Sequence, residues 1–524
     1  MGRGDRDDAL IEALLRPECY PHAVEEPIRR VETHVSWVLL TGPYAYKIKK
    51  PLKLSFLDYS DPTARRGFCE QELRLNRRYA PDLYLDVVGI TRRNGAVEVG
   101  DRLEGAEDFA VKMRQFDRSQ ELDVLLRSNA VQAPELTALG ELVGGFHAHA
   151  GHAPPSSAYG RPGLVHEITL DNFSHLAALQ QRGVSGQQVD RLETAVTRVF
   201  HRVGGLMAER REQGWVRECH GDLHCANIVR WGGRLTPFDG IEFDPALRFI
   251  DVVNDVAFLT MDLAVRGRRD LRRAVLDAWT TTLGDYPGLA LLRYYEAYRA
   301  LVRAKVAALR AGQHAADSPE AIAAGRDLQC YFEFSRDRAQ ESVPNLVLTC
   351  GLSGSGKTWL ARALAPPLDA LHLRSDVERK RLAGLEPLAD SRSMPGGGLY
   401  TREFNDRTYG RLRDCAIGCL QGGENLIVDA AFLRTDERVS MLDLARELGA
   451  TPRILHCTAP MSVLRERVSS RQQKRQDASE AGVDVLERQT GWREEFTDVE
   501  RPLVLEVDTT RPDAVERVLS LLTE

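Results

Sequence analysis

The run GLSGSGKT at residues 351–358 has the residue types and the spacing of a phosphate-binding loop. It fits G-x-x-x-x-G-K-[ST] at every position and stands between an apolar run and a helical segment. Backbone N–H groups can turn inward around phosphate oxygens where glycine relaxes the backbone, and the following helix adds its positive end. The run therefore predicts a site for ATP and Mg²⁺, with the lysine on the phosphates and the threonine hydroxyl on the metal. The predicted contacts are Gly351, Ser353, Gly354, Ser355, Gly356, Lys357 and Thr358.

A carboxylate and two cations follow at the start of the next predicted helix. Asp376 stands at the end of a predicted strand, where its carboxylate could accept the proton of a substrate hydroxyl. Arg379 and Lys380 come one helical turn later and predict contacts with an anionic substrate. The alternative for Ser375 and Asp376 is helix capping, since both residue types are favoured N-caps.

Three further charged residues complete this C-terminal set. Asp429 ends the apolar run NLIVD, as a metal-orienting acid requires, although acids at strand ends are also common in turns. Arg467 and Arg471 stand four residues apart, on one face of a charged helical segment. They predict a mobile lid that grips phosphates, and a solvated charged helix is the alternative.

Residues 345–524 resemble the P-loop small-molecule kinases, among them gluconate kinase, chloramphenicol phosphotransferase, zeta toxin and the phosphoryl-transfer domain of polynucleotide kinase. The resemblance rests on the GLSGSGKT loop and on Ser375-Asp376 followed by Arg379-Lys380. It implies Asp376 as the catalytic base and Arg467 or Arg471 as the lid arginine.

A second, unrelated set lies near the middle of the chain. The run HGDLHCAN at residues 220–227 has the spacing H-x-D-x-x-x-x-N of a kinase catalytic loop. Phosphoryl transfer needs a carboxylate beside the attacking hydroxyl and a metal-holding amide just downstream, and Asp222 and Asn227 fill these places. Asp239, in LTPFDG, takes the position of a further Mg²⁺ ligand by spacing, because its tripeptide reads Phe-Asp-Gly.

Upstream, a lysine and a glutamate could serve the same site. Lys47 and Lys49 share one face of a predicted strand, and one of them could pair with the ATP phosphates. Glu72, in the helical run CEQELRLNRR, is the candidate partner that positions this lysine. Taken singly, each is more often a surface charge. Their order along the chain, ahead of the catalytic loop, favours a kinase-like fold.

Residues 25–335 resemble the aminoglycoside phosphotransferase family, which shares the protein-kinase-like fold. HGDLHCANI is close to its catalytic loop, and the segment from Phe243 to Asp255 resembles its D-P…D-x-x-x-D-A segment. The resemblance implies Asp222 as base, Asn227 and Asp239 as Mg²⁺ ligands, and Lys47 with Glu72 at the triphosphate. The loop TGPY has a single glycine, unlike the loop of protein kinases, and no activation-segment A-P-E triplet follows Asp239. A small-molecule substrate is therefore favoured over a protein.

The elements that position these residues follow from turn signals and hydrophobic periodicity. Residues 34–50 and 83–116 predict hairpins, and residues 64–79 predict a helix. Residues 117–210 and 251–335 are mainly helical in pattern. The polar segment 336–345 predicts a linker, after which strand, glycine-rich loop and helix begin a new α/β domain. We expect a bilobal kinase-like α+β domain at 1–335 and a P-loop domain with a parallel sheet at 346–524.

Composition narrows the class of protein. At 524 residues the chain is too long for one core. No run is long and apolar enough to span a bilayer, and the charged N-terminus lacks a signal-peptide core. The nine scattered cysteines favour reduced thiols in the cytoplasm. A net charge of -6 argues against a dedicated nucleic-acid binder.

Together these features predict a bifunctional ATP-dependent kinase, each half acting on a hydroxyl of a small molecule such as a sugar or amino sugar. Fusion suggests that the two halves act on one metabolite or on consecutive intermediates. Two alternatives stay open. One half could be a nucleotide sensor that regulates the other, or the C-terminal half could phosphorylate nucleic-acid ends through the basic run Arg465, Arg467, Arg471, Lys474 and Arg475.

Overall fold

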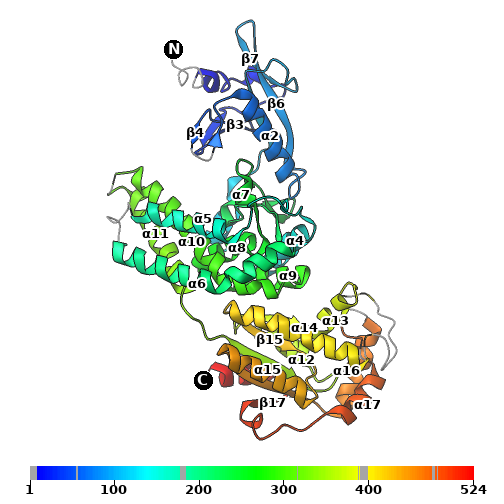
Figure 1. Cartoon of the computed structure of the whole chain (residues 1–524). Helices are drawn as coiled ribbons and strands as arrows, with labels where there is room; N and C mark the ends of the chain where they lie inside the picture. The colour runs from blue at the N-terminus through cyan, green and yellow to red at the C-terminus, as the bar shows by residue number, and fades with distance from the viewer. Residues whose placement is uncertain are drawn as a thin grey trace. The chain divides into compact units, whose positions relative to one another are not determined.

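The computed structural model (Figure 1) describes residues 9–54, 57–177, 184–315, 317–387, 389, 399, 401–474, 478–480 and 482–523. The first eight residues and Arg475 lie outside these ranges, as does the side chain of Lys474. Within the described part of the chain, no helix has the length and apolar character to cross a membrane. The chain forms two compact units. The first comprises residues 1–139, 149–165 and 208–262, and the second comprises residues 140–148, 166–207 and 263–524.

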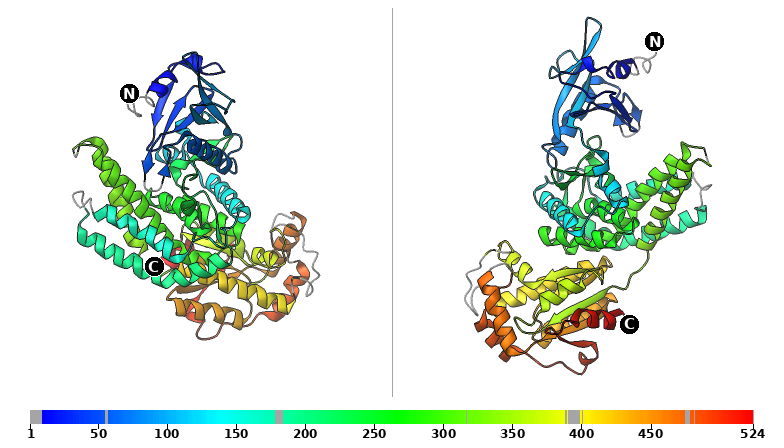
Figure 2. Two further views of the ribbon diagram at one scale, coloured as in Figure 1. Left: turned by 45° about the horizontal axis from the view of Figure 1, so that its top comes forward. Right: turned by 180° about the vertical axis from the view of Figure 1, so that it is seen from behind.

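The first unit is built on a six-stranded antiparallel sheet in the order β1-β2-β3-β8-β6-β7. Helix α2 packs against β6 and β8, and both views of Figure 2 show it lying across the sheet. The predicted hairpins are confirmed: Thr41, Gly42 and Pro43 join β2 to β3, and Asn94 and Gly95 join β6 to β7. The elements are η1 Pro17–Cys19, β1 Arg29–Glu32, β2 Ser36–Leu40, β3 Tyr44–Lys49, β4 Lys53–Leu54, β5 Leu57–Asp58, α2 Pro62–Asn76, β6 Tyr84–Arg93, β7 Ala96–Gly100 and β8 Asp108–Arg114.

Alternating side chains of the sheet pack two cores. One face, with Leu39, Tyr46 and Ile48, packs on the segment that precedes β1. The opposite face, with Ala45 and Val111, packs on α2. Because strand neighbours point to opposite faces, Lys47 and Lys49 lie on the α2 side, where Glu72 of that helix meets them.

Short strands and turns follow the sheet and carry the predicted catalytic loop. β9 pairs with β12, and β10 pairs with β11, in two-stranded antiparallel ladders. The elements are η2 Arg118–Gln120, α3 Leu122–Arg127, β9 Val216–Glu218, η3 Cys225–Asn227, β10 Ile228–Trp231, β11 Arg234–Pro237, α7 Pro245–Arg248 and β12 Phe249–Asp251. Four of the described helices have residues in both units: α4 Ala133–His149, α5 Pro162–Ala177, α6 Gly186–Glu212 and α8 Val252–Val265.

The second unit contains a five-stranded parallel sheet in the order β14-β15-β13-β16-β17. Helices α12 and α18 cover the face that carries Val347, Ile427 and Leu455. α14 and α15 also contact the sheet. The elements are β13 Asn345–Cys350, α12 Lys357–Leu364, β14 Ala370–Arg374, α13 Ser375–Leu382, α14 Arg402–Gln421, β15 Asn425–Asp429, α15 Thr435–Leu448, β16 Thr451–Thr458, α16 Met461–Lys474, α17 Val483–Trp492, η6 Arg501–Leu503, β17 Val504–Asp508 and α18 Ala514–Thr523.

Helices of the kinase-like segment belong to the same second unit and contact this α/β part. Arg272 donates two hydrogen bonds to the buried carboxylate of Glu424 (2.6 and 2.8 Å) and one to Glu296 (2.9 Å). The helices are α9 Arg269–Leu283, η4 Pro287–Leu291, α10 Leu292–Gly312 and α11 Pro319–Arg338. The predicted fold classes, an antiparallel kinase-like sheet and a parallel P-loop sheet, are confirmed.

Candidate active sites

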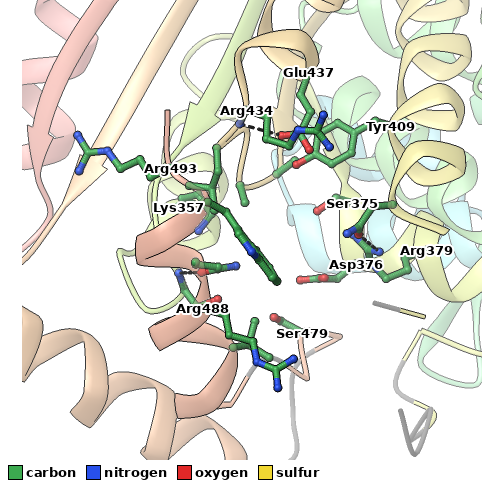
Figure 3. A pocket seen from close by; sticks show the side chains of 18 of the residues that line it. Lys357, Ser375, Asp376, Arg379, Tyr409, Arg434, Glu437, Ser479, Arg488 and Arg493 are labelled. Atoms are coloured by element: carbon green, nitrogen blue, oxygen red, sulfur yellow. Dashed lines mark hydrogen bonds between the residues drawn. The ribbon is translucent and has the colours of Figure 1, made fainter. Parts of the chain in front are cut away.

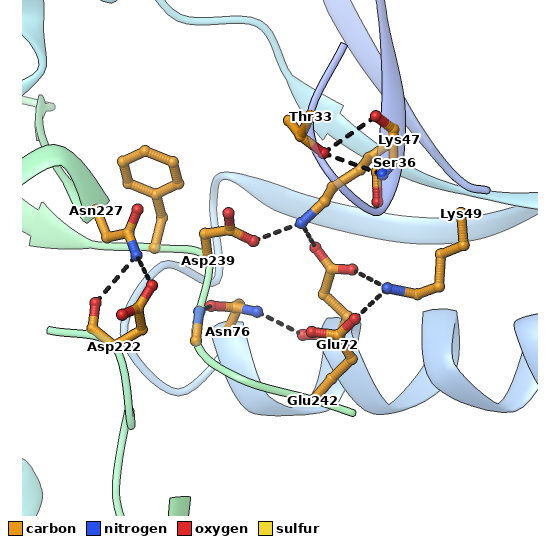
Figure 4. A network of polar contacts seen from close by, with 12 residues as sticks. Thr33, Ser36, Lys47, Lys49, Glu72, Asn76, Asp222, Asn227, Asp239 and Glu242 are labelled. Carbon is orange, nitrogen blue, oxygen red and sulfur yellow. Dashed lines mark hydrogen bonds and ion pairs between the residues drawn. The ribbon is translucent and has the colours of Figure 1, made fainter. Parts of the chain in front are cut away.

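In the first unit, three charged residues from separate elements meet at one point. The Lys47 ammonium on β3 donates to Glu72 Oε1 of α2 at 2.7 Å and also to Asp239 Oδ1. Lys47 and Asp239 are 192 residues apart in the sequence. Figure 4 shows the lysine lying between the two carboxylates. The burial of Lys47 would lower its pKa, but Asp239 and Glu72 hold the pKa well above its ordinary value, so the ammonium stays charged.

Lys49 contacts the other oxygen of the same glutamate. Its ammonium donates to Glu72 Oε2 at 2.7 Å and to Glu242 Oε1, and its side chain is 1% exposed, against 12% for Lys47. Lys47 is therefore the lysine that remains accessible at the site. Sequence reasoning missed Glu242 and Tyr59, whose hydroxyl donates to Glu242 at 2.6 Å. The signal available for Glu242 was an acid only three residues after Asp239.

The catalytic loop brings Asp222 and Asn227 together. Asn227 Nδ2 donates to Asp222 Oδ2 at 2.8 Å and to the Asp222 carbonyl at 3.0 Å (Figure 4). The Asp222 side chain is 35% exposed, so one face of its carboxylate is open to an incoming group. His224 Nε2 lies 3.4 Å from Asp222 Oδ2.

Buried acids hold the backbone of this loop. Asp255 accepts from the N–H of His220 (3.1 Å) and of Gly221 (2.8 Å), and Asp262 accepts from Cys225 N–H (3.0 Å). Gly221 has φ +86°, and a Cβ there would lie 2.7 Å from the Leu247 carbonyl, so the turn requires glycine. These contacts fix the direction in which the Asp222 carboxylate points.

His220 has a structural place rather than a catalytic one. Its ring Nε2 lies 2.9 Å from the Phe238 carbonyl, and its ring Nδ1 accepts from Asp222 N–H at 3.3 Å. Both contacts fit a neutral ring with the proton on Nε2. Burial lowers the pKa of His220, which favours that neutral form.

The Asp239 backbone is held in a conformation that few non-glycine residues adopt, with φ +62°. Its N–H donates to the Tyr84 hydroxyl (3.0 Å), and the next N–H, of Gly240, donates to Asn76 Oδ1 (2.8 Å). Strained backbone that its surroundings hold in place is common at functional sites. The carboxylate of Asp239 and the amide oxygen of Asn227 are hard oxygen donors of the kind that suits Mg²⁺.

In the second unit the P-loop turns tightly between β13 and α12. Gly354 has φ +81°, and a Cβ there would lie 2.7 Å from the Leu464 carbonyl. The Lys357 ammonium donates to the carbonyls of Gly351 and Leu352, both at 2.9 Å. Burial lowers the pKa of Lys357. The lysine thus lies folded over the loop that an anion would enter.

Asp429 lies at the carboxyl end of β15, next to Thr358. Its Oδ2 is 3.1 Å from His372 Nε2, and the His372 backbone N–H donates to Asp277 Oδ1 at 2.8 Å. Burial alone would raise the pKa of Asp429, but hydrogen bonds from His372 and Thr358 hold it below its ordinary value. The carboxylate is therefore charged at neutral pH, as a metal-orienting acid must be. Sequence reasoning missed His372, which precedes Asp376 in the same strand-to-helix segment.

A cavity of about 600 Å³ lies beside the P-loop, within the size range of ligand sites. Figure 3 shows its polar side chains pointing inward from several elements. The predicted site residues on its wall are Ser353, Lys357, Thr358, Asp376, Arg379, Asp429 and Arg471. The other cations on the wall are Arg402, Arg434, Arg488 and Arg493, and the other acids are Glu437 and Glu494.

The start of α13 faces this cavity. Asp376 is in the first turn, and the N-cap residue, Arg374, makes no side-chain capping bond, so the predicted capping alternative is not what the helix uses. Arg379 donates to Asn405 Oδ1 (2.6 Å) and to the Leu399 carbonyl (2.8 Å). Lys380 is on a different face: it is buried, lies outside the cavity wall, and pairs with Glu480 at 3.0 Å.

Of the two predicted lid arginines, only Arg471 lies on the cavity wall. Arg467 instead lies against the P-loop backbone, where it donates to Thr509 Oγ1 at 2.9 Å and to the Gly354 carbonyl at 3.3 Å. Gln489 of α17, which sequence reasoning missed, accepts from the Ser353 N–H at 2.7 Å. That N–H is one of the P-loop donors predicted to face a phosphate.

The cavity wall also includes a half-buried carboxyl group that the sequence did not single out. Glu437, in the first turn of α15, accepts from the Arg434 N–H at 3.3 Å. Burial raises its pKa to about 7. Phe432, just before this turn, has φ +44°, and the fully buried Arg438 donates to its carbonyl at 3.2 Å.

Comparison with known protein families identifies a domain in the C-terminal part of the chain. Residues 346–496 match the family model described as an AAA domain, which confirms the P-loop domain. Uncharacterized proteins of Mycobacterium tuberculosis and Mycobacterium bovis are 29% identical over 477 residues, covering 90% of this chain and 93% of each relative.

Solved structures that are similar to parts of this chain include kinases. A gluconokinase from Sinorhizobium meliloti is 18% identical and covers 35% of this chain and 94% of its own length, with a TM-score of 0.26. A choline/ethanolamine kinase family protein from Mesorhizobium loti is 14% identical, covering 64% and 98%, with a TM-score of 0.37. An amicoumacin kinase in complex with AMP-PNP is 14% identical, covering 64% and 94%, with a TM-score of 0.38.

Proposed function

We propose that the chain is a bifunctional ATP-dependent kinase in which each unit transfers a phosphoryl group to a hydroxyl of a small molecule. The proposal rests on one observation: in each unit, residues that are far apart in the sequence come together in one site. In the first unit Lys47, Glu72 and Asp239 meet in space although they are far apart in sequence. In the second, the P-loop lysine, Asp376 of α13 and Asp429 at the end of β15 line one cavity.

In the first unit, Asp222 would receive the proton of the attacking hydroxyl, because its carboxylate is partly exposed and is oriented by Asn227. Lys47 would bind phosphate oxygens, with Glu72 fixing its position. Asn227 and Asp239 would hold Mg²⁺, which neutralises charge on the transferring phosphoryl group when it is bound. Catalysis would rest mainly on positioning and charge, as in other phosphoryl transfers.

In the second unit, the N–H groups of the P-loop would bind the nucleotide phosphates, with Lys357 and Arg471 adding positive charge. Thr358 and Asp429 would hold Mg²⁺ through oxygen atoms. Asp376 would serve as the base from the first turn of α13. Lys380 and Arg467 would act indirectly, since both side chains are engaged with protein groups outside the cavity.

The acceptor of the second unit is proposed to carry an anionic group beside its hydroxyl. Arg379 and Arg402 line the cavity from α13 and α14, together with Asn405 and Tyr409. Arg402 is the first residue of α14, and the dipole of that helix N-terminus also favours an anion. Burial raises the pKa of Glu437 to about 7, so this carboxyl is partly protonated near neutral pH and carries less negative charge than an ordinary glutamate. Sugar acids and sugar phosphates fit this description, and fusion of two kinases suggests consecutive steps on one metabolite.

The test uses the whole chain with Mg²⁺-ATP and a pool of sugars, amino sugars, sugar acids, sugar phosphates, nucleosides and short oligonucleotides. Products are detected by the mass of one added phosphate. Asp222→Asn should remove one product and leave another, and Asp376→Asn should do the converse. Loss of all products in either variant alone would instead favour one active kinase regulated by the other half. A pool left wholly unphosphorylated by the wild type would count against the kinase proposal.

A further inference from the structure

The first site contains a second buried ion pair next to the one expected of a kinase-like fold. Lys49 donates to Glu72 Oε2 and to Glu242 Oε1, and the Lys49 side chain is 1% exposed (Figure 4). The hydroxyl of the buried Tyr59 donates to Glu242 at 2.6 Å, and Lys49 lies 5.1 Å from the centre of the Tyr59 ring. Each charged group of this set therefore has a partner.

The Lys49–Glu242 pair repeats the arrangement of the Lys47–Asp239 pair. Lys49 follows Lys47 by two residues on the same strand face, and Glu242 follows Asp239 by three residues on the same loop. Glu72 lies between them and gives one carboxylate oxygen to each lysine. Strand β3, helix α2 and the Asp239 loop are thus joined twice, once at the site and once behind it.

The charges at the site indicate why the second ion pair, Lys49 with Glu242, is needed to orient Glu72. Lys47 has two carboxylate partners in this structure, Glu72 and Asp239. If Lys47 binds phosphate and Asp239 binds metal, the contact between them is replaced, and Glu72 shares the Lys47 ammonium with the phosphate. Glu72 would then lose part of its orientation unless its second oxygen were held independently, and Lys49 holds that oxygen at 2.7 Å.

We propose that Lys49 and Glu242 are positioning residues of the first site, which keep Glu72 and the Asp239 loop in place while Lys47 and Asp239 bind nucleotide and metal. The inference rests on the proposed ATP-binding function of the first unit. Burial of Lys49 and Glu242 indicates that neither touches the nucleotide. Further anchors support the role of Glu242: Arg248 donates to its backbone carbonyl at 3.0 Å. Buried ion pairs are often replaceable by apolar residues without loss of stability, so a role in geometry is testable apart from folding.

The experiment measures binding of AMP-PNP by calorimetry across a range of Mg²⁺ concentrations, on the full chain. Lys357→Ala is present throughout, so that binding at the P-loop does not mask the first site. Lys49→Met, Glu242→Gln and the double variant are compared with Lys50→Met, a matched control. Lys50 is also an ion-paired lysine at the end of β3, but its partner Glu32 is exposed. Thermal unfolding is recorded for every variant.

The double variant removes both charges of the pair, so we expect it to fold. It should bind AMP-PNP roughly 10–100-fold more weakly than the parent, and the midpoint of its Mg²⁺ dependence should shift to a higher concentration. Lys50→Met should leave both affinities unchanged, and Lys49→Arg should restore most of the binding. A double variant with wild-type nucleotide and Mg²⁺ affinities would overturn the inference, whatever its melting temperature. Absence of AMP-PNP binding in the Lys357→Ala parent would refute the proposed function itself, and with it the premise.

Discussion

The carboxyl group of Glu437 provides a test of the second cavity that does not depend on knowing a substrate. Glu437 lines the cavity, and burial raises its pKa from 4.5 to about 7. In the variant Glu437→Gln, the side-chain oxygen can still accept the hydrogen bond from the Arg434 N–H, but the side chain cannot ionise. The exposed neighbour Asp436, in the same first turn, supplies the control Asp436→Asn.

The magnitude follows from linkage between protonation and folding. A carboxyl with a higher pKa in the folded state favours folding while it is protonated and loses that contribution as it ionises. The contribution is complete below pH 4.5 and disappears as the pH rises through 7. A shift from 4.5 to about 7 corresponds to about 3 kcal/mol in the free energy of unfolding, at 1.36 kcal/mol for each pKa unit.

The assay is the difference in melting temperature between the glutamine variant and the wild type from pH 4.5 to 8.5. Taking this difference cancels the titrations that both proteins share. As the pH rises, we expect the melting temperature of the variant to increase relative to that of the wild type by roughly 5–10 °C. This difference should level off above pH 7 to 8. Asp436→Asn should show no such rise. A difference that stays constant with pH would refute the reasoning, because the group would then titrate equally in the folded and unfolded chain.

Other outcomes follow from the same contacts. Lys357→Ala should weaken nucleotide binding by at least about tenfold at the P-loop, measured by calorimetry with Lys47→Met present to remove binding at the first site. Asp222→Asn and Asp376→Asn should each lower one phosphorylation rate by about 10²–10⁴, measured by mass spectrometry of the products. Arg438→Met should lower the free energy of unfolding of the second unit by about 3–5 kcal/mol, because it leaves the buried Glu500 without its guanidinium; denaturant unfolding would measure this loss.

The fold class could be predicted because its signals are local. Strand, glycine-rich loop and helix follow one another within twenty residues from Asn345, and the turn at Asn94-Gly95 joins two alternating strands. The P-loop residues of the cavity were predicted for the same reason. Asp222 and Asn227 were predicted by their fixed spacing along one loop.

Apart from the spacing of Glu242, three residues after Asp239, the remaining site residues had no local signal. Glu242, His372, Gln489 and Glu437 each stand in ordinary sequence and gain their place only through contacts with distant segments. Lys380 and Arg467 show the converse. Each has the residue type and spacing of a ligand-binding cation, but the rotation of its helix turns it toward protein groups outside the cavity.

The sequence by itself determined which chemical groups the chain carries and, through short-range spacing, which loops present them. It could not distinguish Lys47 from Lys49, because both lie on the same face of one strand. The tertiary structure decided between them by burial: α2 and the Asp239 loop enclose Lys49 and leave Lys47 partly exposed. Burial and partnership depend on residues up to 193 positions away, and the energy of a charge depends on that environment.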